Sequence, residues 1–174
     1  MQNNAFLDIP AEDILAKTNG ALTANNDLNM FVTSWVGILE ISSGKITAAN
    51  AGHEYPAVKK ADGHFELIKD RHSLVLGAME DSSYKGYEIT LEPGDSLFLY
   101  TDGVTEAANK DSAMFGSDRM IEALNIDPGA DPETLIRIVR HSVDQFTGDA
   151  TQFDDITMVC MRYKGCGKPD KRSH

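Results

Sequence analysis

Two apolar strands that each carry a carboxylate at one end constrain this chain more than any other feature. The first covers residues 96–100 and runs directly into Asp102, within the sequence Thr-Asp-Gly-Val. The second covers residues 156–161 and follows the pair Asp154 and Asp155. Two such strands can place their acidic groups in one crevice, where oxygen ligands suit Mg²⁺ or Mn²⁺ better than zinc. For any single aspartate, however, a simple turn is the more common explanation.

Hydrophobic periodicity predicts the elements around these two strands. Helices are expected to begin near Pro10, at Ser117 and at Asp131. Further strands, each bounded by turn residues, are expected at 31–41, 46–51, 55–59, 65–68 and 87–91. The buried face of the first helix is predicted to contain Ile14, Leu15, Thr18 and Leu22. Antiparallel hairpins followed by a helical pair predict an α+β fold with mostly antiparallel sheets.

The strand at 31–41 is a special case, because apolar residues alternate onto both of its faces. Phe31 and Leu39 lie on one face, and Val32 and Ile38 on the other. A strand with this pattern is typically covered on both sides. We therefore expect it to lie buried between two layers.

Composition limits the class of protein and its partners. With 174 residues, 41% hydrophobic and 25% charged, the chain has the size and make-up of one globular domain. It contains no run long enough to span a membrane, and Cys160 and Cys166 lack metal-binding spacing. A formal net charge of −11 argues against nucleic acid as a partner. We expect a cytoplasmic domain without membrane contact, followed by a disordered basic tail at 164–174.

The sequence around the aspartates resembles a known family. Three segments carry the likeness: Asn-Ala-Gly-His-Glu-Tyr-Pro at 50–56, Tyr-Thr-Asp-Gly-Val-Thr-Glu-Ala at 100–107, and Phe-Asp-Asp-Ile-Thr at 153–157. They are similar to motifs of the metal-dependent (PPM-type) protein phosphatases, and most similar to the bacterial sigma-regulatory branch typified by stage II sporulation protein E. The resemblance covers about Pro10 to Tyr163. It implies part of an α–β–β–α layered sandwich.

The same resemblance implies a reaction and a substrate. The family hydrolyses phosphoserine or phosphothreonine on proteins at a centre of two Mn²⁺ or Mg²⁺ ions. Such ions neutralise the phosphoryl oxygens and activate water, and carboxylates are their natural bridging ligands. The implied substrate is a phosphorylated regulatory protein, an anti-anti-sigma factor of a bacterial partner-switching pathway.

The family pattern also implies roles for individual residues. It matches Asp102 and Asp154 to metal ligands, and Asp155 to a position that is often Asn, which favours a supporting hydrogen bond over ligation. Three polar neighbours either orient the site through hydrogen bonds or simply cap a helix: Thr101, Thr105 and Glu106. Thr157 is a further candidate to contact the substrate or to support the ligands.

Gly103 and His53 complete the predicted site. Gly103 is expected to take a left-handed conformation where the strand turns sharply, with its backbone a further candidate ligand. His53 follows an Ala-Gly pair at a strand end. It either contacts the substrate or a metal-bound water, or serves as a structural residue in the turn.

Two motifs of the family do not occur in this sequence. Family members carry Gly-Asp-x-Tyr-Asp and Asp-Val-x-Gly-x-Gly before the helix that begins here near Pro10, and both supply metal ligands. Residues 1–163 are thus expected to form a phosphatase domain that lacks its N-terminal metal-binding strands. Alone, such a chain would hold one metal or none, because affinity depends on ligand count.

Three explanations fit the missing motifs. The chain is a fragment of a larger phosphatase, or a natural pseudo-phosphatase that binds a partner without hydrolysis, or a subunit whose missing strands come from another chain. Removing strands from a sandwich also exposes sheet edges and apolar faces. A homo-oligomer formed through these edges is therefore expected.

Overall fold

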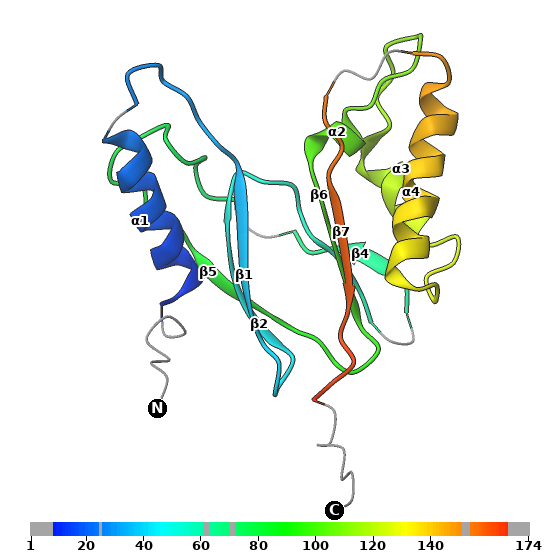
Figure 1. Ribbon diagram of the computed structural model, residues 1–174, viewed down its shortest axis with the longest axis horizontal. Coiled ribbons are helices and arrows are strands. Elements are labelled where there is room, and N and C mark those ends of the chain that lie inside the picture. The colour runs from blue at the N-terminus through cyan, green and yellow to red at the C-terminus, as the bar shows by residue number, and fades with distance from the viewer. Residues whose placement is uncertain (1–8, 25, 61–62, 70–71, 151–153, 167–174) are drawn as a thin grey trace, which may run out of the picture. The chain divides into compact units, whose positions relative to one another are not determined.

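The computed structural model describes residues 9–24, 26–60, 63–69, 72–150 and 154–166 (Figure 1). Contacts between residues divide these into two compact units. Unit 1 contains the described residues of Met1–His53 and Asp70–Thr90, and unit 2 those of Glu54–Lys69 and Leu91–His174. The predicted basic tail from residue 167 onward, and Phe153 of the third family-like segment, lie outside the described residues.

Unit 1 is a three-stranded antiparallel sheet with one helix packed on it (Figure 1). Its elements are α1 (Ala11–Thr23), β1 (Ser34–Glu40), β2 (Lys45–Ala51) and β5 (Gly86–Thr90), and the strand order is β1-β2-β5. Ser34 pairs with Ala51, and Lys45 pairs with Thr90. The core between helix and sheet contains Ala11, Leu15, Ala49, Ala51, Leu76 and Tyr84.

The buried face of α1 differs from the prediction. Leu15 is buried as expected, but Thr18 is exposed and Leu22 is 39% exposed. Asn19 takes the inward place instead, at 1% exposure. Its side chain accepts a hydrogen bond from the Gly77 N–H at 2.9 Å and donates one to the Met79 carbonyl at 2.9 Å. A polar residue can be buried here because distant backbone groups satisfy its amide.

The expectation that the strand at 31–41 is buried between two layers is wrong. β1 is shorter, and its residues are only partly buried or exposed. Phe31 is 64% exposed and Ile41 is 66% exposed. Within the described part of the chain, β1 is an edge strand of its sheet, so it has a hydrogen-bonded neighbour on one side only.

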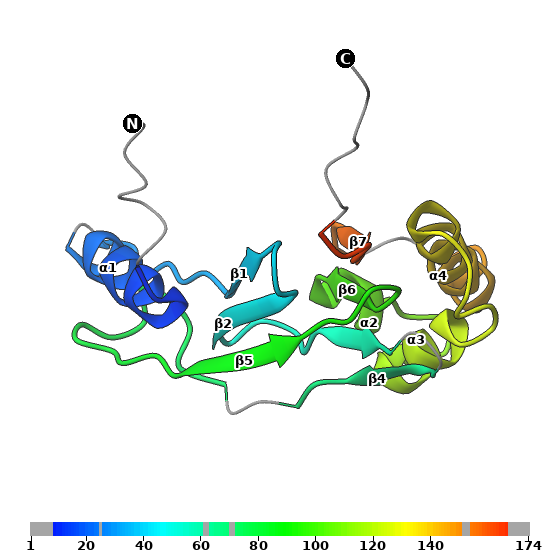
Figure 2. The same cartoon turned by 90° about the horizontal axis from the view of Figure 1, so that it is seen from below.

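Unit 2 contains a four-stranded antiparallel sheet in the order β4-β3-β6-β7 (Figure 2). Its strands are β3 (Ala57–Lys59), β4 (Phe65–Leu67), β6 (Ser96–Tyr100) and β7 (Met158–Arg162). Its helices are α2 (Asp102–Thr105), α3 (Gly116–Leu124) and α4 (Pro132–Thr147). α3 and α4 pack against each other, and their contacts with β4 and β7 place them over the sheet (Figures 1 and 2).

α4 begins at the predicted cap. The Asp131 carboxylate accepts a hydrogen bond from the Thr134 N–H at 3.0 Å, and this bond holds the pKa of Asp131 below its usual range. Leu135, Val139 and Val143 form the buried stripe of the helix. They join a core that also contains Phe98 and Tyr100 of β6. The strand that leads to Asp102 is thereby fixed by packing.

The predicted α+β class with antiparallel sheets is confirmed, since every pairing between named strands is antiparallel. Among the helices that the structure describes, none is both long enough and apolar enough to cross a membrane.

Candidate active site

β6 delivers Asp102 to the surface at the point where its chain turns into α2. Phe98 and Tyr100 are 0% and 3% exposed, whereas Asp102 is exposed. The α2 turn closes through a hydrogen bond from the Glu106 N–H to the Asp102 carbonyl at 2.7 Å. The Oδ1 atom of Asp102 accepts a bond from the Gly103 N–H at 3.0 Å. A rigid strand and a tight turn therefore present this carboxylate to solvent.

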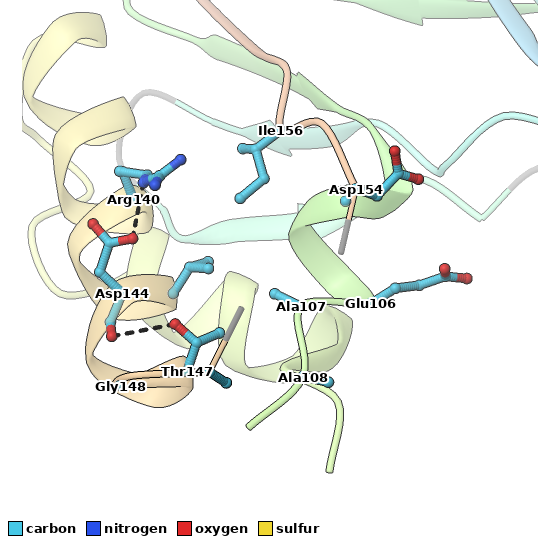
Figure 3. Close-up of a pocket in the computed structure, with 12 residues that line it drawn as sticks. Glu106, Ala107, Ala108, Arg140, Asp144, Thr147, Gly148, Asp154 and Ile156 are labelled. Atoms are coloured by element: carbon cyan, nitrogen blue, oxygen red, sulfur yellow. Dashed lines mark hydrogen bonds and ion pairs between the residues drawn. The ribbon is translucent and has the colours of Figure 1, made fainter. Parts of the chain in front are cut away.

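Asp154 is held in a similar local way. Its Oδ1 atom accepts a hydrogen bond from the N–H of the next residue, Asp155, at 2.7 Å, and both residues are exposed. In Figure 3 the carboxylates of Asp154 and Glu106 both point away from Arg140 on α4. For Asp155, the described hydrogen bonds involve its backbone, through both N–H and carbonyl.

Thr101 joins the two carboxylate-bearing segments. Its N–H donates to the Thr157 carbonyl at 3.0 Å, and its Oγ1 accepts from the Thr157 N–H at 3.0 Å. The same hydroxyl donates to the Asp155 carbonyl at 3.2 Å. We call these three bonds the Thr101 clasp. Thr101 and Thr157, both predicted as polar neighbours of the site, thus hold the segments of Asp102 and Asp154 together.

Gly103 is required for a reason other than the predicted one. It lies inside the α2 turn and is not among the glycines with positive φ, so the expected left-handed conformation is wrong. Instead, a Cβ atom added at Gly103 would lie 2.3 Å from the Asp155 carbonyl oxygen. The two segments pack so closely that residue 103 has no room for a side chain.

Glu54 is a site residue whose role the sequence did not reveal. Its Oε1 atom accepts a hydrogen bond from Thr105 Oγ1 at 3.3 Å, on the buried side of the α2 turn. The Tyr100 hydroxyl is also buried next to Glu54. Burial, and then the negative charge of Glu54, raise the pKa of Tyr100 well above its ordinary value. Glu54 therefore contacts the buried side of the α2 turn, although it lies 51 residues from Thr105 in the sequence.

His53 belongs to unit 1 and has well-defined partners there. Its N–H donates to the Asn50 side chain at 2.8 Å, its carbonyl accepts from the same side chain at 3.0 Å, and its Nδ1 lies 3.2 Å from Thr33 Oγ1. Asn50 is 1% exposed. These contacts give His53 a structural place in the turn after β2, and its contact with a substrate stays a prediction.

The chemistry of the donor atoms, two carboxylates on adjoining segments, is of the kind that a divalent metal ion prefers. Carboxylate oxygens are the ligands that Mg²⁺ and Mn²⁺ prefer, and the clasp brings two carboxylate-bearing segments together. Within the described ranges, however, no group of three or more His, Cys, Asp or Glu side chains could hold a metal. Asp102 and Asp154 would therefore hold one side of such a centre.

Comparison with known proteins finds relatives of this chain. Protein IcfG of Synechocystis sp. (strain ATCC 27184 / PCC 6803 / Kazusa) is 34% identical over 139 residues, and phosphoserine phosphatase RsbU of Bacillus subtilis (strain 168) is 26% identical over 158 residues. These matches cover 80% and 90% of this chain but only 22% and 46% of those proteins. The chain therefore spans less than half the length of either relative.

Solved structures agree on the fold. The SiaA-PP2C domain of Pseudomonas aeruginosa superposes with a TM-score of 0.76 at 20% identity, over 88% of this chain and 61% of that one. A structure of the PP2C phosphatase domain of SpoIIE from Bacillus subtilis gives a TM-score of 0.72 at 18% identity, over 91% and 46%. The family model for stage II sporulation protein E matches residues 1–164. The chain therefore belongs to the SpoIIE family of PP2C-type phosphatase domains.

Proposed function

We propose that this chain contributes Asp102 and Asp154 to a Mn²⁺- or Mg²⁺-dependent centre that hydrolyses phosphoserine or phosphothreonine on a protein. The observation that carries the proposal is the Thr101 clasp, which holds the two carboxylate-bearing segments side by side. When bound, the ions supply positive charge to the phosphoryl oxygens and acidify water. The chain's own contribution is to orient the two carboxylates, with Gly103 allowing the close approach.

The proposal extends to the ligands that complete the centre. Residues 1–163 form the part of a phosphatase domain that carries the Asp-Gly and Asp-Asp motifs, and the other carboxylates come from strands outside this sequence. The similarity to a phosphoserine phosphatase, RsbU, supports the reaction. We further propose that the substrate is a phosphorylated anti-anti-sigma regulator, as the sequence resemblance implies.

A second function is favoured by the small number of candidate metal ligands among the described residues. Two carboxylate segments without a grouped third metal-binding side chain, within the described ranges, also suit a pseudo-phosphatase. Such a module would recognise the phosphoprotein without hydrolysing it. The two functions share the fold and differ in turnover.

The experiment compares the wild-type full-length protein that carries this chain with Asp102→Asn and Asp118→Asn variants. Asp118 is exposed in the first turn of α3, so Asp118→Asn removes the same charge from a position with no place in the site. We expect Mn²⁺-dependent release of phosphate from a phosphoserine peptide, lost in Asp102→Asn by at least about 100-fold and retained in Asp118→Asn. Activity that survives both chelator and Asp102→Asn would exclude the metal mechanism. Partner binding without turnover would establish the pseudo-phosphatase.

A further inference from the structure

The turn that presents Asp102 is too short to hold its own shape. α2 contains four residues. It closes through a bond from the Glu106 N–H to the Asp102 carbonyl at 2.7 Å, and the Val104 N–H bonds to the carbonyl of the preceding Thr101 at 3.0 Å. A single helical turn is unstable by itself, because ordering its backbone is unfavourable relative to the few bonds that it gains. The direction of the Asp102 carboxylate therefore depends on contacts from other segments.

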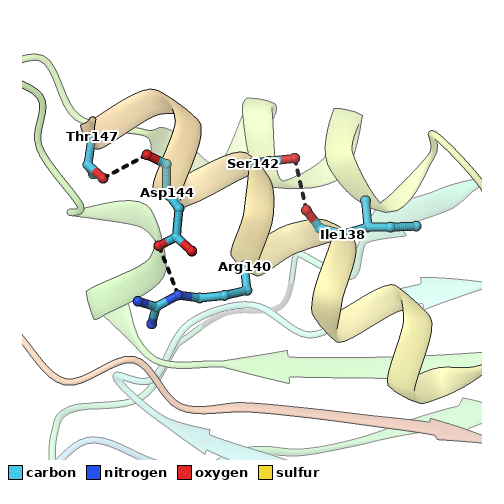
Figure 4. Close-up of polar contacts among 5 residues, drawn as sticks. All are labelled: Ile138, Arg140, Ser142, Asp144 and Thr147. Carbon is cyan, nitrogen blue, oxygen red and sulfur yellow. Dashed lines mark hydrogen bonds and ion pairs between the residues drawn. The ribbon is translucent and has the colours of Figure 1, made fainter. Parts of the chain in front are cut away.

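α4 faces this turn across a cavity of about 290 Å³, which Gly103 and Arg140 both line. Two polar contacts on this side of α4 remain within the helix. Arg140 Nε donates to Asp144 Oδ1 at 2.9 Å, and Thr147 Oγ1 donates to the Asp144 carbonyl at 3.3 Å (Figure 4). These bonds organise α4 itself and do not reach the α2 turn.

Glu54 reaches the α2 turn because of the strand pairing in unit 2. β3 pairs antiparallel with β6, with Ala57 opposite Phe98. The residues that precede β3 therefore run alongside the end of β6, toward Asp102. Glu54 lies three residues before β3 and is partly buried there.

The Glu54 carboxylate contacts the turn through Thr105. Thr105 Oγ1 lies 3.3 Å from Glu54 Oε1 and 3.2 Å from the Asp102 carbonyl oxygen. A hydroxyl group has one proton, so these two oxygens share a single donor. Thr105 is 9% exposed, so water competes little for this donor. Glu54 is thus linked to the backbone of Asp102 through one side chain.

A second hydroxyl group lies next to Glu54, from a residue on the other side of Asp102 in the sequence. Tyr100 is 3% exposed, and its hydroxyl is buried without a hydrogen bond of ordinary geometry to the described residues. The Glu54 carboxylate is close enough for its negative charge to act on this hydroxyl. A buried hydroxyl needs an acceptor, and a carboxylate has lone pairs for several donors. Glu54 therefore lies beside residues both before and after Asp102.

We propose that Glu54 is a positioning residue of the metal centre. Its carboxylate accepts from Thr105 and lies beside Tyr100, and it thereby fixes the direction in which the α2 turn presents Asp102. Its negative charge also adds to the attraction that the site exerts on a divalent cation. Glu54 itself touches neither metal nor phosphate. The inference rests on the proposed function, because it requires Asp102 to be a metal ligand.

The test compares Mn²⁺ binding by the full-length protein that carries this chain and by its Glu54→Gln variant. Glutamine keeps the shape of the side chain and one acceptor oxygen but loses the charge. Calorimetric titration measures the affinity, and the electron paramagnetic resonance spectrum of bound Mn²⁺ reports its coordination. We expect the affinity to fall by about 10-fold, as is typical when a residue that orients a metal ligand is changed. Glu66→Gln is the matched control, because Glu66 is exposed on β4 in the same unit, and it should bind Mn²⁺ as the wild-type protein does.

Kinetics distinguish a positioning role from a purely structural one. With a phosphoserine peptide, Glu54→Gln should need more Mn²⁺ for half-maximal activity, while kcat at saturating Mn²⁺ and KM for the peptide stay close to the wild-type values. A purely structural role predicts instead a lower melting temperature of the metal-free protein, with the Mn²⁺ affinity of the folded protein unchanged.

Thr105 provides an independent variant. Thr105→Val removes the hydroxyl that joins Glu54 to the turn and should weaken Mn²⁺ binding, and Thr105→Ser should restore it. In the double variant of Thr105→Val with Glu54→Gln, the two losses should add less than fully, because both changes break the same bond. Wild-type Mn²⁺ affinity in Glu54→Gln or in Thr105→Val, or equal weakening in Glu54→Gln and Glu66→Gln, would overturn the inference.

Turnover separates this inference from the proposed function. If the wild-type protein hydrolyses the phosphoserine peptide and Glu54→Gln binds Mn²⁺ equally well, the positioning role fails and the phosphatase stands. If Glu54→Gln weakens Mn²⁺ binding but neither protein hydrolyses the peptide, catalysis fails and the positioning role stands. A wild-type protein that binds no Mn²⁺ would refute both.

Discussion

The carbonyl oxygen of Asp155 lies where a side chain at residue 103 would begin. A Cβ atom there would be 2.3 Å from this oxygen and 2.9 Å from its carbon, and both belong to backbone that cannot rotate away. Because Gly103 has no Cβ atom, the Asp102 turn can pack directly against the segment that contains Asp154. The absence of a side chain at this one residue therefore sets the distance between the two segments.

Gly103→Ala should destabilise the protein by about 1–3 kcal/mol, because the two backbone segments must move apart. It should also weaken Mn²⁺ binding, since the carboxylates move with their segments. The matched control is Gly20→Ala in α1, where an added Cβ meets no atom within 4 Å. That change should stabilise the protein by up to about 1 kcal/mol, because alanine favours a helix. Thermal unfolding and calorimetric titration with Mn²⁺ measure both effects, and a neutral Gly103→Ala would contradict the close approach.

The free energy of unfolding is predicted to depend on pH through Tyr100. Burial and the charge of Glu54 raise its pKa above the ordinary value of 10.0. As the pH rises past that value, the unfolded chain loses the tyrosine proton while the folded protein keeps it, so the free energy of unfolding falls. Burial also raises the pKa of Cys160 from 9.0 to about 11, which adds a decrease of the same sign.

Urea denaturation from about pH 8 to about pH 11 should therefore show stability falling with pH. Tyr100→Phe should make this decrease shallower above pH 10.0 and leave the part due to Cys160, which begins at lower pH, and the part due to Tyr84, whose pKa is also raised by burial. The same slope in the variant and the wild-type protein would show that the Tyr100 hydroxyl does not resist ionisation in the folded state.

The Thr101 clasp connects the end of β6 to the segment that leads into β7. β6 and β7 already pair from Ser96 with Arg162 to Tyr100 with Met158. The clasp extends that pairing beyond the strand ends, where the chain has left the sheet and carries the aspartates. Removing the Thr101 hydroxyl should therefore let the two aspartate-bearing segments move apart without disrupting the pairing of β6 with β7.

Thr101→Val keeps the shape of the side chain and loses both hydroxyl bonds. It should cost about 1–2 kcal/mol of stability and weaken Mn²⁺ binding. Thr101→Ser, which keeps the hydroxyl, should restore most of that affinity. If Thr101→Val bound Mn²⁺ as tightly as the wild-type protein, the clasp would have no part in organising the carboxylates.

Elements fixed by local sequence could be predicted, and contacts across long stretches of sequence could not. The strand at 96–100 and the cap of α4 at Asp131 follow from adjacent residues, and both are confirmed. The partners of Asn19 and Glu54 lie 58 to 60 and 51 residues away, and no periodicity reveals them. The family-like motif at 100–107 predicted Asp102 and Gly103 as site residues. The need for glycine at 103, however, comes from the Asp155 carbonyl, which lies near it only in the folded chain.

Each of the two described sheets ends in strands that have a paired neighbour on one side only. Among the described strands, β1 and β5 end one sheet and β4 and β7 end the other. Exposed apolar side chains lie in or near these strands in the sequence: Val159 within β7 at 53%, Ile41 directly after β1 at 66%, and Phe31 three residues before β1 at 64%. An open strand edge with apolar residues beside it is a template for pairing with another chain.

We therefore predict that the isolated chain self-associates through the β1 edge. Sedimentation velocity should show a larger species that grows with protein concentration, because pairing two edges buries both the backbone groups and the apolar side chains. Ile41→Lys, directly after β1, should shift the chain toward the monomer, since a charge at the edge must be desolvated to pair. Ile126→Lys is the matched control, because Ile126 is 70% exposed and belongs to the connection between α3 and α4, not to β1 or the residues that flank it. A chain that stays monomeric at all concentrations, or that responds equally to both substitutions, would contradict association through this edge.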